Sequence, residues 1–194
     1  MIILQLYITL LGAILAGIIN SIFCKLNILK FLKIPIDFNK IFIDNKRIFG
    51  NNKTWKGFLG YIAFNIIFAI LFGWIWKITK LEHLNFFYIN HENTIIYNVL
   101  IGFLIGLFYA LFELPNSFLK RRLNIEPGKT TTGFKRIFFI ILDQADSIFG
   151  IASVVWMFYP IGIEIYLLYI VVGTVTHLLI NIILYFLHLR KNMF

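Results

Sequence analysis

Three acidic residues, Glu113, Asp143 and Asp146, lie inside long hydrophobic stretches, and Lys, Arg, Pro and Gly are frequent in the loop between them. Asp143 and Asp146 are spaced i, i+3, so they share one face if their stretch is helical. Glu113, Ser117 and Lys120 follow an i, i+4, i+7 pattern, which also places them on one helical face. These two polar stripes indicate a site for a cation and phosphate groups.

Acids at these positions are costly unless something compensates their charge. A charged side chain inside a membrane costs about 2.5 to 3.5 kcal/mol on insertion scales, so three unpaired acids would cost about 8 to 10 kcal/mol. That is comparable with the whole stability of a domain. The acids must therefore be paired, protonated or bound to a cation. Oxygen donors suit hard cations, and Mg²⁺ in particular is held by one or two carboxylates together with substrate phosphates.

Donors for phosphate groups surround the acids in the sequence. Ser117, Lys120 and Arg121 follow Glu113, and a loop rich in Gly and Thr spans residues 127–133. Residues 50–57 (GNNKTWKG) precede another hydrophobic stretch, so a helix N-terminus there could face an anion. Their spacing differs from GxxxxGK[ST], so a Walker-type phosphate loop is not predicted.

The composition indicates which elements must position these residues. The 194 residues are 60% hydrophobic and 14% charged, with a mean hydropathy of +0.84. Soluble proteins average roughly 45 to 50% apolar and about 25% charged residues, so this is an integral membrane protein. The single Cys24 excludes an internal disulfide and a zinc site built from cysteines. The net charge of +9 is attributed to basic cytoplasmic loops and not to nucleic-acid binding.

Hydropathy predicts an all-α integral membrane protein with five transmembrane helices in a single polytopic domain, residues 1–194. The loops 24–56 and 119–136 and the C-terminal tail contain sixteen of the eighteen Lys and Arg residues. Because such residues favour the cytoplasm, we expect the N-terminus outside and the C-terminus inside the cell, with the site on the cytoplasmic side of the plasma membrane. The expected spans are residues 3–23, 57–76, 95–118, 137–159 and 162–188.

Several alternatives remain open from the residues alone. The first hydrophobic stretch could be a cleaved signal peptide, although it is long and lacks a basic start. The buried acids could belong to a small transporter or proton-coupled carrier, or could pair with bases in a structural subunit. His177 is expected to be a hydrogen-bonding residue between packed helices. The sequence does not specify an oligomeric state, and a homodimer is one option.

Taken together, the motifs resemble those of the membrane cytidylyltransferases that make CDP-activated lipids. The resemblance is carried by Ser117-x-x-Lys120-Arg121, by Pro127-Gly128, and by Asp143-Gln144-x-Asp146-Ser147. The segments GNNKTWKGF (50–58) and ELPNSFLKR (113–121) are similar to the CDP-archaeol synthase branch in particular. The His-Gly-Gly sequence of bacterial phosphatidate cytidylyltransferases is absent from this chain.

The resemblance implies that a lipid phosphate attacks the α-phosphate of CTP to give a CDP-activated lipid and pyrophosphate, with Mg²⁺ as cofactor. The acceptor would be either an archaetidic acid-type lipid or phosphatidic acid. Asp143, Asp146 and Lys120 would be catalytic, and Asp143 and Asp146 would bind the metal with Glu113 as a candidate third ligand. The substrate-binding residues would be Lys53, Thr54, Asn116, Ser117, Lys120 and Arg121.

Overall fold

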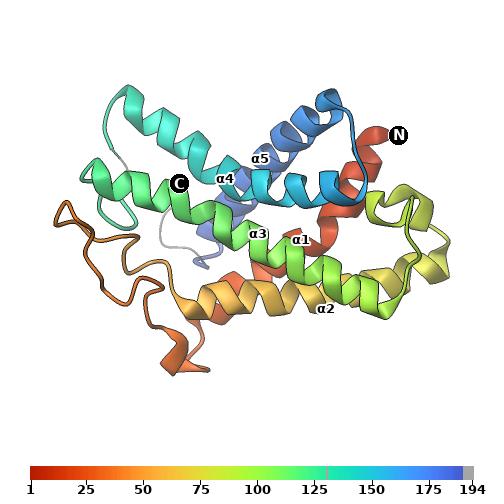
Figure 1. Ribbon diagram of the computed structural model, residues 1–194, viewed down its shortest axis with the longest axis horizontal. Helices are drawn as coiled ribbons and strands as arrows, with labels where there is room; N and C mark the ends of the chain where they lie inside the picture. Colours follow the sequence, from red (N-terminus) through yellow and green to blue (C-terminus); the bar gives the residue numbers. More distant parts are fainter. Residues whose placement is uncertain (130, 190–194) are drawn as a thin grey trace.

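The computed structural model describes residues 1–129 and 131–189 and consists of helices joined by loops (Figure 1). Its five long helices confirm the five predicted spans, and each is long and apolar enough to cross a membrane. Three short 3-10 helices lie in the connections. The elements in chain order are α1 Ile2–Lys25, η1 Lys30–Leu32, α2 Trp55–Thr79, η2 Glu82–Leu84, η3 Phe86–Tyr88, α3 Ile95–Arg122, α4 Phe134–Phe158 and α5 Ile163–Phe186.

Local sequence explains where these helices begin and end. Thr54 caps α2 by accepting a hydrogen bond from the Gly57 amide at 3.3 Å, and Thr94 caps α3 in the same way. The expected loop 119–136 is shorter than predicted, since α3 continues to Arg122 and α4 starts at Phe134. Basic residues in the last turn of α3 interact favourably with the helix dipole, which accounts for its extension.

Neighbouring helices pack most closely from α2 to α3 and from α3 to α4. A Cβ atom added at Gly102 or Gly106 of α3 would lie 2.5 Å from a backbone Cα of α2, at Ile66 or Ile62 respectively. A Cβ at Gly150 of α4 would lie 2.5 Å from the Phe108 carbonyl oxygen. Glycine therefore lets these backbones touch, and the acids of α3 and α4 are held at a fixed separation.

The loops gather at the two ends of the helical bundle. The segment from residue 26 to 54 and the described residues 123–129 and 131–133 lie together at the left end of Figure 1. The connections around residues 80–94 and 159–162 lie at the right end. Large apolar side chains such as Ile67 (54% exposed) and Val171 (59% exposed) face outward from the helices, as expected for surfaces that contact lipid.

Candidate functional site

One cavity of about 470 Å³ opens at the end of the bundle that carries the two basic loops. Its polar walls come from the segment before α2, from the C-terminal half of α3 and from the middle of α4. The structure brings together every residue predicted for the site, and all of them line this cavity: Lys53, Thr54, Glu113, Asn116, Ser117, Lys120, Arg121, Asp143 and Asp146.

Asn116 of α3 lies between the two aspartates of α4. Its Nδ2 atom donates a hydrogen bond to Asp143 Oδ1 at 2.7 Å and another to Asp146 Oδ2 at 2.8 Å. Asp146 is buried, and its other oxygen accepts a bond from the Ser147 amide at 2.6 Å. A single amide nitrogen thus brings both carboxylates to one point on the cavity wall.

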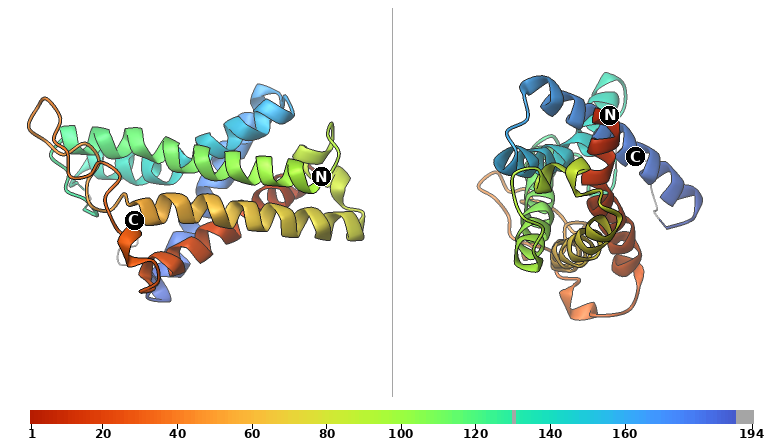
Figure 2. Two further views of the ribbon diagram at one scale, coloured as in Figure 1. Left: turned by 60° about the horizontal axis from the view of Figure 1, so that its bottom comes forward. Right: turned by 90° about the vertical axis from the view of Figure 1, so that its right-hand side faces the viewer.

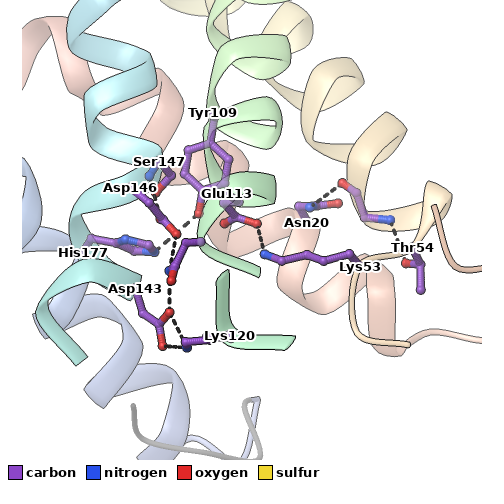
Figure 3. Close-up of polar contacts among 12 residues, drawn as sticks. Asn20, Lys53, Thr54, Tyr109, Glu113, Lys120, Asp143, Asp146, Ser147 and His177 are labelled. Atoms are coloured by element: carbon purple, nitrogen blue, oxygen red, sulfur yellow. Dashed lines mark hydrogen bonds and ion pairs between the residues drawn. The ribbon is translucent and has the colours of Figure 1, made fainter. Parts of the chain in front are cut away.

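Lys120 stands one turn beyond Asn116 and forms an ion pair with Asp143 (Figure 3). Its ammonium nitrogen also lies 5.6 Å from the centre of the Phe139 ring. Both residues of the ion pair line the cavity. The positive charge of Lys120 is therefore held next to the two acids, as a phosphate-binding group would be.

Lys53 reaches the cavity from the loop before α2 and forms an ion pair with Glu113 of α3 (Figure 3). Burial acts to lower the pKa of the Lys53 ammonium, but the charges of Glu113, Asp146 and Asp143 outweigh this effect and raise it. These acids therefore favour the charged form of Lys53. Its neighbour Thr54 faces the same cavity while its hydroxyl caps α2.

Arg121 supplies a third positive charge and is 7% exposed. Its Nε and Nη1 atoms are enclosed and have no hydrogen-bond partner among the described residues. Leaving buried charged donors unsatisfied is costly, so this guanidinium is suited to a ligand that supplies acceptors. Ser117, also buried, lines the cavity one turn before it.

The donors around Asn116 fit a hard cation. Asp143 and Asp146 offer carboxylate oxygens, and the Oδ1 atom of Asn116 is enclosed without a hydrogen-bond partner. These are the oxygen donors that Mg²⁺ takes in proteins. Within residues 1–129 and 131–189, no three acidic, His or Cys side chains converge as a metal site. Glu113 is paired with Lys53 instead, and its role as a third ligand stays a prediction.

A buried carboxylate in the first loop fixes the segment that carries Lys53. Asp37 accepts hydrogen bonds from Arg47 Nη2 at 2.7 Å and from the Phe49 and Gly50 amides at 3.0 Å each. Burial acts to raise the pKa of Asp37, but these bonds outweigh it and lower the pKa to about 2. The ionised Asp37 is thus the centre of the hydrogen bonds that order the first loop. These bonds end at Gly50, three residues before Lys53, and so fix the chain that carries it.

Arg122 attaches the same loop to the end of α3. Its Nε atom lies 2.6 Å from Asp44 Oδ2, and its guanidinium lies 4.3 Å and 5.3 Å from the ring centres of Phe118 and Phe42. Arg122 also donates to the Arg47 carbonyl at 2.6 Å. These contacts, which we call the Arg122 clamp, place the first loop over the cavity.

Residues behind the acids were not predicted as part of the site. His177 of α5 makes hydrogen bonds between helices, as expected, with Nδ1 3.1 Å from the Gln144 carbonyl oxygen and Nε2 3.4 Å from the Tyr109 hydroxyl. Asn181, one turn later, donates to Gln144 Oε1. Gln144 lies between the two aspartates, so α5 fixes that turn of α4. Polar residues at i, i+4 in an apolar helix are the signal that could have indicated this role.

Comparisons with known proteins agree with this geometry. A family model described as CarS-like, CDP-archaeol synthase, matches residues 1–194. The chain is 32% identical over 162 residues to the CDP-archaeol synthase of Archaeoglobus fulgidus, covering 81% of this chain and 82% of that protein. It is 35% identical over 158 residues to that of Methanococcus vannielii, covering 81% of each.

A solved structure has the same fold. It is described as an intramembrane enzyme for archaeal membrane lipids biosynthesis and superposes with a TM-score of 0.60 at 21% identity. The match covers 91% of this chain and 92% of the other. At this identity the similarity concerns the arrangement of the helices, and it supports the five-span architecture.

Fold and site together define a multi-span membrane protein with a charged cavity built for phosphorylated substrates. The chain belongs to the CDP-archaeol synthase family. It is therefore a CTP-dependent cytidylyltransferase that acts on a lipid phosphate in the membrane. Membership in an enzyme family decides against the transporter and structural-subunit alternatives.

Proposed function

We propose that this protein transfers the cytidylyl group of CTP to the phosphate of an archaetidic acid-type lipid. A phosphate oxygen of the lipid attacks the α-phosphorus of CTP, the bond from that phosphorus to the bridging oxygen breaks, and pyrophosphate leaves. The archaeal CDP-archaeol synthases among its relatives support the ether lipid as the acceptor. Phosphatidic acid is the competing acceptor.

The observation that carries this proposal is the arrangement of three cations around the paired carboxylates. Lys53, Lys120 and Arg121 line the same cavity as Asp143 and Asp146. Phosphoryl-type transfer needs mainly positioning and charge neutralisation, so an enzyme of this kind requires no covalent intermediate. Buried donors such as those of Arg121 interact strongly with the phosphates they bind.

Each residue has a task in this proposal. Arg121 and Lys120 hold phosphate oxygens, with Ser117 as a further donor beside them. Lys53, which its ion pair with Glu113 holds in position, binds the triphosphate as a point charge. Asp143 and Asp146 would hold Mg²⁺, with the Asn116 amide fixing the orientation of both carboxylates, and the ion would supply positive charge to the triphosphate.

We also propose that the cavity faces the cytoplasm, with the N-terminus outside and the C-terminus inside. The support is the basic character of the loops at the cavity end of the bundle (Figure 1). Labelling of single cysteines tests it: cysteines placed in residues 40–46 should react with a membrane-impermeant maleimide only in inside-out vesicles. Reaction from the outside of intact cells would reverse the orientation.

The activity is tested with purified protein in detergent, radiolabelled CTP and either archaetidic or phosphatidic acid. We expect a CDP-lipid with archaetidic acid, loss of product when EDTA removes Mg²⁺, and a loss of about a thousandfold in Asp146→Asn. Glu164→Gln, an acid-to-amide change at the start of α5 far from the cavity, is the matched control and should retain activity. No CDP-lipid from either acceptor would refute the proposal.

A further inference from the structure

The cavity does not end at its charged residues but continues between α1 and α5 as an apolar crevice. The lining residues recur every three or four positions, so each helix presents one face to the crevice. The cavity is also lined by polar residues of the same two helices, Asn20 and Ser21 of α1 and His177 and Asn181 of α5. What we call the α1/α5 crevice is the mainly apolar remainder of the lining, Leu10, Ala13, Ile14, Gly17 and Ile18 from α1, and Gly173, Thr176, Ile180 and Leu184 from α5.

The α1/α5 seam is the loosest in the bundle. The helices form a ring in chain order, with α1 beside α2, α2 beside α3, α3 beside α4 and α4 beside α5, and α1 and α5 touch far less than these neighbours do. The α2/α3 and α3/α4 seams are closed by backbone contact at the glycines described above. In the right-hand view of Figure 2, α1 and α5 run along the side of the bundle away from α3.

Two hydrogen bonds join α1 and α5 across this seam. Toward one end the Tyr7 hydroxyl lies 3.0 Å from Thr176 Oγ1, and toward the other Lys25 donates to the His188 carbonyl oxygen. From Tyr7 to Lys25, α1 rises about 27 Å, which is nearly the thickness of the hydrocarbon core. The seam between these bonds therefore lies at the depth of the lipid chains.

The size of the cavity limits what it can enclose. A volume of about 470 Å³ suits one ligand of moderate size, since pockets for such ligands measure roughly 300 to 1,000 Å³. It cannot enclose CTP together with the long hydrocarbon chains of a membrane lipid. The chains must therefore extend out of the cavity. The α1/α5 crevice is a path along which they can do so while contacting mainly apolar side chains, without removing charged groups from water.

We propose that the α1/α5 crevice is the binding site for the hydrocarbon chains of the acceptor lipid, which enters sideways from the bilayer with its phosphate toward Lys53, Lys120 and Arg121. This inference rests on the proposed function. The residues at Gly17, Ile18 and Ile180 then set how bulky and how long the chains can be. Selection of the acceptor by its chains is thus separate from recognition of its phosphate.

Adjacent residues on one helix provide matched variants for the test. Ile180 lines the crevice, whereas Leu179 is 54% exposed on the outer face of α5. Ile18 lines it, whereas Ile19 is 37% exposed on the outer face of α1. Each is changed to Trp, and steady-state kinetics are measured with CTP and with long-chain and short-chain lipid phosphates in detergent.

We expect Ile180→Trp and Ile18→Trp to raise KM for the long-chain acceptor about tenfold, the effect of displacing a few methylene groups. KM for CTP and turnover of the short-chain acceptor should stay unchanged, and Leu179→Trp and Ile19→Trp should behave like the unaltered protein. The inference would be overturned if the two variants of a pair, such as Ile180→Trp and Leu179→Trp, raised KM for the long-chain acceptor equally. It would also be overturned if a crevice variant lost as much activity with the short-chain acceptor as with the long-chain one. Absence of turnover with every acceptor in the unaltered protein would instead refute the proposed function.

A second measurement needs no variant. A lipid phosphate with a photoreactive diazirine near the middle of one chain is irradiated in the presence of the unaltered protein, and the labelled peptides are identified by mass spectrometry. Labels concentrated on the α1 and α5 wall residues, and displaced by unlabelled lipid phosphate, support the inference. Labels spread over the outer surfaces of α2 and α3 without displacement contradict it.

Discussion

Lys53, from the loop before α2, extends its ammonium group onto the carboxylate of Glu113 in the middle of α3 (Figure 3). The contact spans sixty positions of the sequence. It compensates an acid that would otherwise be unpaired inside a membrane helix, and it holds a flexible lysine at one place in the cavity. The pair thus stabilises the fold, and in the proposed function Lys53 also binds substrate. Variants of the two residues can separate these roles.

Removing one member of this pair should cost stability, and removing both should restore it. Lys53→Met leaves the Glu113 carboxylate without its partner, which should destabilise the protein by about 1 to 3 kcal/mol. The double variant Lys53→Met/Glu113→Leu should recover most of this loss and still lack activity, because the cation for the triphosphate is missing. Thermal unfolding in detergent and CTP turnover measure the two effects. A double variant as unstable as Lys53→Met would contradict the pairing.

Asn116 should be as important to the site as the acids it joins. Asn116→Ala removes the amide that contacts both Asp143 and Asp146, so we expect turnover to fall about a hundredfold and Mn²⁺ binding, followed by electron paramagnetic resonance, to weaken. Asn65→Ala is the matched control, since Asn65 is equally buried but bonds within its own helix to the Tyr61 carbonyl oxygen at 2.9 Å. Unchanged Mn²⁺ binding in Asn116→Ala would argue against a metal at the aspartates.

The Arg122 clamp should be needed to keep the first loop over the cavity. Arg122→Ala removes the ion pair with Asp44 and the contacts with two Phe rings, so the loop should be cleaved faster by trypsin and KM for CTP should rise about tenfold. Arg136→Ala, an exposed arginine at the start of α4, is the control. Trypsin cleavage of the first loop is also measured with CTP present at one concentration for all proteins. If CTP slows cleavage of Arg122→Ala as much as it slows cleavage of the unaltered protein, the clamp does not position the loop.

Acid should loosen the first loop through Asp37. The pKa of Asp37 is lowered from 3.8 to about 2 in the folded protein, so its stabilising effect is complete above 3.8 and is lost as the pH falls toward 2. Cleavage of residues 36–50 by pepsin should therefore increase over this range. Dividing each rate by that of Asp37→Asn, whose loop is already weakened, removes the pH dependence of pepsin itself. A ratio that stays constant from pH 4 to pH 2 would exclude Asp37 as the cause.

The spans and the polar stripes could be predicted because they depend on local pattern. Hydropathy identifies each helix from its own residues, and helical spacing places Glu113, Ser117 and Lys120 on one helical face and Asp143 and Asp146 on another. The partner of Glu113 could not be predicted, since it depends on how residues 26–54 fold over the cavity. That fold is fixed by contacts between distant positions, such as Asp37 with Gly50 and Arg122 with Asp44.

The supporting residues on α5 were hidden for a related reason. His177 and Asn181 are single polar residues in a strongly apolar helix, and spacing alone does not say which helix they face. Their contacts with Gln144 depend on α5 packing against α4. The identity of the residues was therefore visible in the sequence, but the residue that each one contacts was not.

The ring of helices is closed by the first and the last helix of the chain. While the protein is being made, α1 can pack against α2 but has no contact with α5 until α5 has been inserted. Gln144 also lacks His177 and Asn181 until then. Until α5 is in place, the turn of α4 that carries the aspartates therefore lacks its support, and the crevice lacks one of its two walls.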